Sequence, residues 1–420
     1  MHGLELKVEK MGKVNELKTS QEYINQEHQY SAHNYHPLPV VLSKGEGVFV
    51  WDVEGKKYYD FLSAYSAVNQ GHSHPKIIEA LVEQSKKLCL TSRAFHSDKF
   101  AEFSKFITEY FGFDKVLPMN TGAEAVETAI KISRKWGYEV KKIATNEAKI
   151  VVCGNNFHGR TITIISASND PDARGNFGPY TPGIISIEYN NIKALEEALQ
   201  DKTVAAFMVE PIQGEAGVYV PEDGYLAKAY NLCKKHNVLF VADEVQTGIA
   251  RTGELLAVCH EGVKPDILIL GKAISGGVYP VSCVLANNNV MNVIQPGQHG
   301  STYGGNPLAC AVAMAALTVV KEEKLAERAR YLGEKLRERL RNIPSDMVSL
   351  VRGKGLLNAI VIKPKNGKEA WDVCLKLAEN GLLAKPTHGD IIRFAPPLII
   401  TEEQLMECAD IIEKSILSFN

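Results

Sequence analysis

A series of short apolar runs, separated by helix-like stretches, constrains the fold of this chain more than any other feature. From Lys149 onward the runs read KIVVC, TITIISAS, AAFMVE, VLFVAD, ILIL and VSCVLA, and a helical periodicity lies between several of them, as in residues 224–236. Strands with so few polar residues need cover on both faces, which a parallel sheet flanked by helices provides. The pattern therefore predicts an α/β fold with a mostly parallel sheet.

The chain on either side of this region predicts further elements and a division into parts. Alternation over residues 47–61, broken at Glu54-Gly55, predicts a hairpin. Helical periodicity covers residues 75–88, 98–111 and 121–136, then a long stretch from Asn306-Pro307 past Val320 and a charged one over 322–341. Beyond residue 320 the pattern is α+β. We expect an N-terminal segment of residues 1–60 that packs with the small domain, a large domain of 61–320 and a small domain of 321–420.

Composition narrows the possible partners. The 47 basic and 49 acidic residues are mixed, without dense runs, and the net charge is -2, which argues against nucleic acid or a membrane surface as the main partner. No apolar stretch approaches the roughly 20 residues of a membrane span. The eight cysteines are scattered without a CxxC pair, which favours a reducing compartment. Residues 1–30 resemble neither a transit peptide nor a secretory signal, so we expect a cytoplasmic protein.

Two histidines close together, His72 and His74, raise the question of a metal site. No cysteine or carboxylate cluster accompanies them, and Pro75 follows as a helix-starting residue. We therefore interpret them as part of a turn and expect no metal site.

Two neighbouring strands each end in one charged residue, Asp243 in VLFVADEVQTG and Lys272 in DILILGKAISGG. Ligands of α/β sheets bind at such strand ends. A lysine and an acid at this place suit pyridoxal phosphate, which needs an amine for its Schiff base and an acid facing its pyridinium nitrogen. The alternative is that Lys272 is an ordinary surface cation. A phosphate loop is not supported, because the GxxxxGK pattern lacks its first glycine.

A third feature is the start of a helix at Asn120-Thr121-Gly122-Ala123-Glu124. Thr121 and Glu124 have the spacing of a capping box, which by itself explains them. The same small residues leave free N–H groups at a helix N-terminus, where a phosphate is well held. Beside the lysine and aspartate, the phosphate interpretation is favoured.

Eight ordered motifs make the chain resemble the fold-type I, class III aminotransferases, and within them most closely the ornithine aminotransferases. They are AHNYHPLPV (32–40), FLSAYSAVNQGH (61–72), NTGAEAVETA (120–129), FHGRT (157–161), EPIQGEAGV (210–218), ADEVQTG (242–248), LGKAISGG (270–277) and STYGGNP (301–307). The resemblance covers residues from about 23 to the C-terminal helix. It implies a large domain with a mostly parallel seven-stranded sheet, a smaller α+β domain, pyridoxal phosphate as cofactor, and a homodimer with shared active sites.

The resemblance also implies roles around the cofactor. Lys272 would form the Schiff base and move the substrate proton, and Asp243 would keep the pyridinium nitrogen protonated. Phe157 and Val245 would sandwich the ring, unless they are ordinary core residues, and Gln246 would bond its phenolic oxygen. The phosphate would be held by N–H groups of Gly122 and Ala123 and by Thr302 from the other subunit. Thr121 and Ser301 complete the cofactor-binding set.

For the substrates, the resemblance implies a switch between two carboxylate patterns. Glu215 would neutralise Arg393 when ornithine binds and move away for 2-oxoglutarate, unless the two form a purely structural ion pair. Arginine suits this task because its planar fork meets carboxylates with two bonds. Arg160 and Tyr35 would hold the α-carboxylate of ornithine, and Tyr65 would form a wall of the pocket.

The expected reaction is ornithine δ-amino transfer to 2-oxoglutarate, giving glutamate 5-semialdehyde and glutamate by a ping-pong mechanism. The alternative is an acetylornithine or 4-aminobutyrate aminotransferase. His158 is common in acetylornithine-type relatives; we expect it to fill space beside the ring, although a position facing the substrate would affect specificity. A non-catalytic regulator on the same fold is disfavoured because the short N-terminal stretch of mixed charge leaves no room for a DNA-binding segment. A catalytically inactive scaffold is disfavoured because Lys272, Asp243 and Arg160 are all present.

Overall fold

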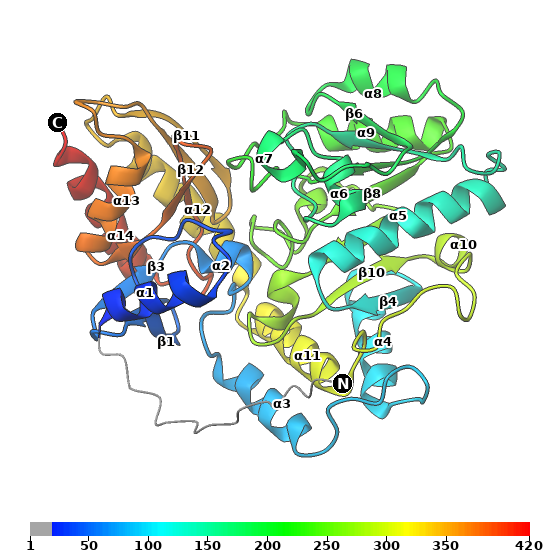
Figure 1. The fold of residues 1–420 in the computed structure, drawn as a ribbon, viewed down its shortest axis with the longest axis horizontal. Helices are drawn as coiled ribbons and strands as arrows, with labels where there is room; N and C mark the ends of the chain where they lie inside the picture. The colour runs from blue at the N-terminus through cyan, green and yellow to red at the C-terminus, as the bar shows by residue number, and fades with distance from the viewer. Residues whose placement is uncertain (1–18) are drawn as a thin grey trace, which may run out of the picture.

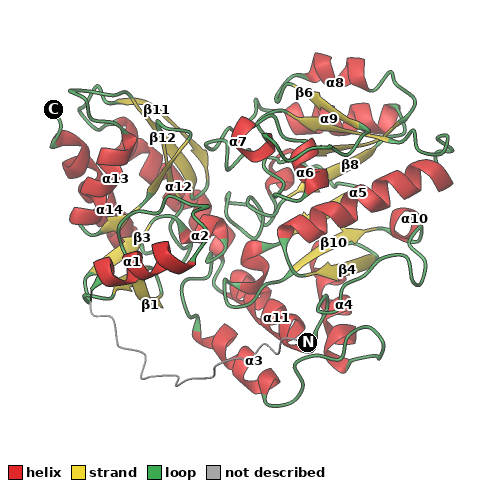
Figure 2. Ribbon diagram, in the orientation of Figure 1, coloured by secondary structure: helices red, strands yellow, loops and turns green. Residues whose placement is uncertain are grey.

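Two groups of strands, each with its own helices, make up residues 19–420, the part of the chain that the computed structural model describes. Figure 2 shows the strands of the larger group on the right, among them β4, β6, β8 and β10, and those of the smaller group on the left. The expected N-terminal segment begins outside the described residues.

The larger group is a seven-stranded sheet with the order β4-β10-β9-β8-β7-β5-β6. Six strands run in one direction, and β10 runs antiparallel to both of its neighbours. The sheet is therefore mostly parallel, as the sequence predicts. Its strands are β4 (Lys115–Met119), β5 (Lys149–Cys153), β6 (Ile184–Ile187), β7 (Val204–Val209), β8 (Leu239–Asp243), β9 (Ile267–Leu270) and β10 (Ser282–Ala286).

Successive residues of these strands belong to two separate cores, one on each face. Val151, Phe207 and Phe240 pack in one cluster, while Val152 and Met208 pack in the other. This period-two division follows from the pleat of a strand and explains why the strands are apolar throughout. The helices of this part are α3 (Pro75–Ser85), α4 (Asp98–Phe111), α5 (Gly122–Glu139), α6 (Ile162–Ser166), α7 (Pro171–Arg174), α8 (Ile192–Ala198), α9 (Tyr225–Lys235), η1 (Ala257–Glu261), η2 (Lys272–Ser275), α10 (Asn288–Met291) and α11 (Pro307–Glu322).

The smaller group combines both ends of the described chain, seen in Figure 1 as blue strands beside orange and red elements. β3 pairs in parallel with β13, with Tyr59 opposite Leu382, in a sheet of order β1-β2-β3-β13. A second sheet has the order β11-β12-β15-β14. The elements are α1 (Ser20–Tyr30), β1 (Leu42–Glu46), β2 (Phe49–Asp52), β3 (Lys57–Asp60), α2 (Ser63–Ser66), α12 (Leu325–Arg341), β11 (Val348–Lys354), β12 (Leu357–Ile362), α13 (Ala370–Glu379), β13 (Leu382–Leu383), β14 (Lys385–Thr387), β15 (Ile391–Phe394) and α14 (Glu402–Leu417).

Most of the individual elements match the sequence prediction, with one clear error. The hairpin of β2 and β3 forms, and the helices begin at their capping residues, as α5 does after Thr121. The run TITIISAS, predicted as a strand, instead forms the short helix α6. Its Ile164 and Ile165 are buried, because packing of apolar residues against the sheet satisfies them without strand pairing and overrides β propensity.

Among residues 19–420 no helix is both long and apolar enough to span a membrane. All eight cysteines are free. Nε2 of His72 lies 2.7 Å from Asp60, and Nε2 of His74 lies 2.9 Å from Glu323, so the two histidines contact different carboxylates.

Candidate active site

The carboxyl ends of β8 and β9 bring Asp243 and Lys272 to one edge of the large sheet. Asp243 is the last residue of β8 and aligns with Ile269 in β9, while Lys272 follows the end of β9. They share a cavity of about 180 Å³. Its lining residues are Gly122, Ala123, Phe157, His158, Gly159, Glu210, Asp243, Val245, Gln246, Thr247 and Lys272. The structure thus brings together seven of the ten predicted cofactor residues.

Lys272 is held in an uncommon conformation with φ of 48°, and such backbone is found where function fixes a residue. Burial and, next, the nearby charge of Arg393 lower the pKa of its amine to about 8, against the opposing carboxylates of Glu215 and Asp243. An amine with this pKa is partly neutral at neutral pH, as a nucleophile and proton carrier must be.

Asp243 is held from two sides. Its Oδ1 accepts the N–H of Val245 at 3.1 Å, and its Oδ2 lies 2.6 Å from Nδ1 of His158. Burial alone would lower the pKa of His158, but the hydrogen bond and charge of Asp243 outweigh it, so the pKa is raised. His158 therefore supports Asp243 as a hydrogen-bond donor, which corrects the expectation that it merely fills space.

Glu210 is a further buried acid in this cavity, for which the sequence analysis gave no role. Burial raises the pKa of Glu210 to about 7, against the charge of His158, and the carboxylate accepts the N–H of Phe157 at 2.9 Å. It follows the end of β7 as Asp243 ends β8. An acid at a buried strand end was the signal that identified Asp243, and it also marks Glu210.

The N-terminus of α5 forms one end of the cavity. The Thr121 hydroxyl accepts the N–H of Glu124 at 3.2 Å, and the carboxylate of Glu124 accepts the N–H of Thr121 at 2.9 Å, so the predicted capping box is present. The N–H groups of Gly122 and Ala123 belong to the first helical turn, where the helix itself provides no acceptor. The helix end can therefore cap itself and bind an anion through these two groups.

Thr121 lies beside a second opening, of about 340 Å³, which also borders Gly122 and Lys272. Ser301 is tied to this region, because its hydroxyl accepts a hydrogen bond of 2.8 Å from Nδ2 of Asn120. Thr302 is exposed and lines neither cavity. Within one chain, Thr302 is the predicted cofactor residue that the structure leaves apart from the others.

The predicted pair of Glu215 and Arg393 is an ion pair, with Nη2 and Oε2 3.0 Å apart. Arg393 is almost fully buried, near the carboxyl end of β15. Its Nη1 also donates to the carbonyl of Gly214 and to Oε1 of Gln246, each at 3.2 Å. The bond from Arg393 to Oε1 orients the Gln246 amide and leaves its Nε2 group free to donate to another partner.

Tyr65 covers this pair from an unusual turn. Its ring centroid lies 4.7 Å from Cζ of Arg393 and 5.8 Å from Nζ of Lys272. All four residues of α2 have positive φ, 45° at Ala64 and 60° at Tyr65 among them, so the turn is left-handed and strained. Burial raises the pKa of Tyr65, and the neighbouring phenol of Tyr35 contributes to the shift. Tyr35 itself is 77% exposed.

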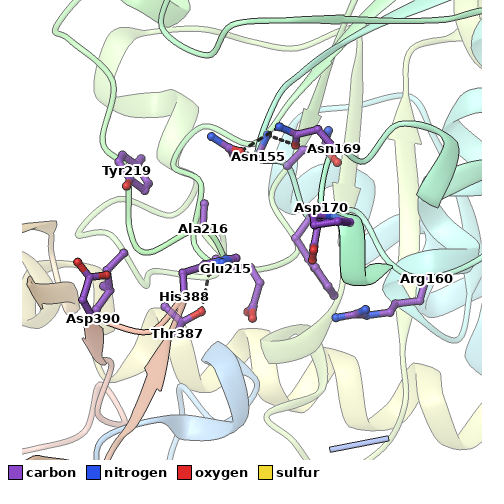
Figure 3. A pocket seen from close by; sticks show the side chains of 14 residues that line it. Asn155, Arg160, Asn169, Asp170, Glu215, Ala216, Tyr219, Thr387, His388 and Asp390 are labelled. Atoms are coloured by element: carbon purple, nitrogen blue, oxygen red, sulfur yellow. Dashed lines mark hydrogen bonds between the residues drawn. The ribbon is translucent and has the colours of Figure 1, made fainter. Parts of the chain in front are cut away.

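Arg160 belongs to an outer cavity of about 480 Å³ that opens next to the first. Its guanidinium lies 5.5 Å from the ring centroid of Phe157, and Glu215 lines the same cavity. Figure 3 shows Arg160 on one side, His388 and Asp390 on the other, and Glu215 between them. Glu215 thus borders the outer cavity while its carboxylate contacts the buried Arg393.

The residues present fit pyridoxal phosphate. Gly122 and Ala123 would offer free helix N–H groups to its phosphate, the carboxylate of Asp243 would face its pyridinium nitrogen, and the amine of Lys272 would react with its aldehyde. Val245 lies against the space at Gly122, where an added Cβ would come within 3.1 Å of its side chain. The glycine therefore keeps the space between the helix end and Val245 open.

Comparison with known proteins agrees with this site. The model of the family "Aminotransferase class-III" matches residues 30–416. "Ornithine aminotransferase, mitochondrial" of Drosophila melanogaster is 67% identical over 392 residues, 93% of this chain and 90% of the relative. The structure of ornithine aminotransferase from Toxoplasma gondii, with partial occupancy of PLP at its active site, has a TM-score of 0.95 at 52% identity and covers 96% and 95% of the two chains. Acetylornithine aminotransferase from Elizabethkingia anophelis is 64% identical, with a TM-score of 0.88 over 96% of this chain and 100% of the other.

Proposed function

This chain belongs to the class-III aminotransferase family, and on that premise we propose that it is an ornithine δ-aminotransferase. The reaction transfers the δ-amino group of L-ornithine to 2-oxoglutarate and gives glutamate 5-semialdehyde and glutamate. One site serves both substrates in turn, in a ping-pong mechanism. Two names in the comparison bear on this, since relatives at high identity are called ornithine aminotransferase in one case and acetylornithine aminotransferase in another.

The observation that carries the proposal is the ion pair of Glu215 and Arg393, 3.0 Å long beneath Tyr65. L-Ornithine presents its distal amine to the site and has no carboxylate beside it, so an unpaired buried arginine would be left without a counter-ion. 2-Oxoglutarate places a carboxylate there. A movable glutamate, bordering the outer cavity, lets the same arginine serve the acceptor without penalising the donor.

The protein residues then divide the chemistry. Class-III aminotransferases use pyridoxal phosphate, which when bound supplies an aldehyde that exchanges between amines and a ring that accepts electron density. Lys272 Nζ would take the proton from the substrate carbon bonded to the reacting nitrogen and return it to the cofactor carbon on the other side of that nitrogen. Asp243, held by His158, would keep a proton on the ring nitrogen. Arg160 and Tyr35 bind the outer carboxylate of ornithine.

The test is an absorbance spectrum of the purified protein before and after L-ornithine is added without a keto acid. We expect the yellow form to be lost and then restored by 2-oxoglutarate. N-acetylornithine and 4-aminobutyrate serve as competing donors, and Lys272→Met serves as a control with the site otherwise intact. Loss of the yellow form with a rival donor but not with ornithine would overturn the substrate assignment and leave the family assignment standing.

Replacement of Tyr35 separates ornithine from 4-aminobutyrate. Tyr35 is proposed to bind the α-carboxylate of ornithine, and the carboxylate of 4-aminobutyrate lies one carbon nearer to the reacting amine. Tyr35→Phe should therefore weaken the use of ornithine more than that of 4-aminobutyrate. An equal effect on both donors would show that Tyr35 only packs.

We also propose a homodimer whose sites are shared, with Thr302 serving the partner's phosphate. Large exposed aromatic side chains such as Tyr30, Tyr35 and Phe95 support the proposal, because a subunit interface would cover such side chains. Mixed dimers of Lys272→Ala and Thr302→Ala subunits test it. If Thr302 acts across the interface, one site of the mixed dimer is intact and activity returns. If it acts within its own chain, both sites stay impaired.

We also propose that the chain is divided into an N-terminal segment of residues 1–60, a large domain of 61–320 and a small domain of 321–420. The pairing of β3 with β13 supports the packing of the N-terminal segment with the small domain, and limited proteolysis near residue 320 tests the boundary. A cytoplasmic location is the proposal from the composition, although the name of the Drosophila relative includes "mitochondrial". Cell fractionation decides between the two compartments.

A further inference from the structure

Arg251 is among the largest fully buried side chains of the described residues, with no exposed surface, and the mechanism does not use it. It follows β8 in the loop that begins at Asp243. Its guanidinium has four hydrogen bonds, all to neutral oxygens. Nε and Nη2 donate to Oδ1 of Asn69 at 3.1 and 2.6 Å, and Nη1 donates to the carbonyls of Leu356 and Pro396 at 2.9 and 2.7 Å.

These acceptors belong to segments that carry the substrate-facing residues. Asn69 follows Tyr65 in the segment after α2, and Pro396 follows Arg393 just beyond the end of β15. Asn69 returns a bond of 2.8 Å from its Nδ2 to the carbonyl of Ile249, beside Arg251. A single side chain therefore connects the loop after Asp243 with both segments.

An arginine suits this connection because its three nitrogens donate to three separate oxygens, those of Asn69, Leu356 and Pro396. Burial lowers the pKa of Arg251 to about 9, opposed by the charge of Asp60, so holding the cation here is unfavourable by itself. A lysine side chain carries a single nitrogen, which cannot reach all three of these separate oxygens. An apolar residue would leave those oxygens unpaired, at about 1–3 kcal/mol each.

We propose that Arg251 is a positioning residue. Its hydrogen bonds hold the end of β15 that carries Arg393 in place relative to Asp243 and Lys272. This placement sets the binding site for the second carboxylate of the acceptor. The inference rests on the proposed function. Since ornithine leaves Arg393 paired with Glu215, a displaced β15 affects the acceptor and not the donor. A residue that only stabilised the fold would affect the two half-reactions alike.

The test compares Arg251→Lys with a matched buried arginine, Arg337→Lys. Arg337 lies in α12 and bonds the carbonyl of Gly355 and Oδ1 of Asn358, both in the small domain. Glutarate, a dicarboxylate without the keto group, is titrated into each variant, and both half-reactions are followed in single turnovers. Thermal unfolding measures the loss of stability of each.

For Arg251→Lys we expect glutarate binding to weaken by about tenfold or more, since misplacing a binding group by ~1 Å can have effects up to about 100-fold. The ornithine half-reaction should stay within about twofold, and Arg337→Lys should leave both within about twofold, because its side chain shares no hydrogen-bond partner with that of Arg251. Equal losses in both half-reactions, or unchanged glutarate binding, would overturn the proposal. Failure of the wild-type protein to react with ornithine would overturn only the proposed function, because the glutarate comparison does not need ornithine.

A second variant decides the question if Arg251→Lys does not accumulate. Asn69→Ala removes both bonds from Arg251 to Asn69 and the bond from Asn69 to Ile249, and it keeps the Arg251 bonds to the carbonyls of Leu356 and Pro396. We expect it to slow the ornithine half-reaction more than it weakens glutarate binding, the reverse of the first split. A weakening of glutarate that equals the loss with ornithine would show that Arg251 does not position Arg393.

Discussion

Replacing Lys272 with methionine is expected to stabilise the cofactor-free protein at neutral pH, although it removes the residue on which the proposed catalysis depends. The reason is the cost of burying a charged amine. Burial lowers the pKa of Lys272 from the ordinary lysine value of 10.5 to about 8, so below that pH the folded protein holds a cation that water would solvate better. Methionine has a similar length and no charge, and it fills the same space.

The size of the effect follows from the pKa. Each tenfold change in proton affinity corresponds to about 1.4 kcal/mol, so the shift amounts to roughly 3 kcal/mol. Between about pH 8 and 10.5 the unfolded chain binds more protons than the folded one, and wild-type stability therefore rises with pH in that window. The advantage of methionine is full below about pH 8 and disappears above about pH 10.5.

Urea unfolding of both cofactor-free proteins at a fixed protein concentration measures this difference, since the stability of an oligomer depends on concentration. Lys272→Arg is the matched control, because arginine stays charged throughout and should show no such gain. The reasoning is refuted if Lys272→Met is no more stable than wild type at about pH 7, or if its advantage is unchanged at about pH 10.

Three further changes test the site from other sides. Glu215→Gln should tighten glutarate binding by about tenfold or more, because the buried arginine then has no other counter-ion; unchanged binding in a titration would contradict the switch. Ala64→Gly should raise the free energy of unfolding by about 1 kcal/mol, because glycine tolerates the left-handed turn; Ala67→Gly, at a right-handed position, should lower it, and equal signs in urea unfolding would disprove strain. His158→Ala should weaken cofactor binding by about 10–100-fold, the value of a hydrogen bond to the Asp243 carboxylate, and an unchanged dissociation constant in a spectroscopic titration would remove His158 from that role.

Much of the fold follows from local properties of the sequence. Helix α4 runs from Asp98 to Phe111 as its periodicity predicts, because an amphipathic helix needs only spacing and end signals. Asp243 and Lys272 could be identified because each follows a buried apolar strand. The error at α6 has the opposite origin: TITIISAS has the composition of a strand, and only its tertiary neighbours determine that it forms a helix.

The assembly of the site could not be read from the sequence without the resemblance. His158 and Asp243 are 85 positions apart, and nothing local to either predicts their 2.6 Å contact. The Glu215–Arg393 pair and the four bonds of Arg251 join segments from different parts of the chain. The sequence by itself determined which strand ends carry the chemistry, because apolar patterning and end residues are local. Tertiary structure alone decided which buried charges meet, because those contacts depend on how strands and loops distant in sequence are packed together.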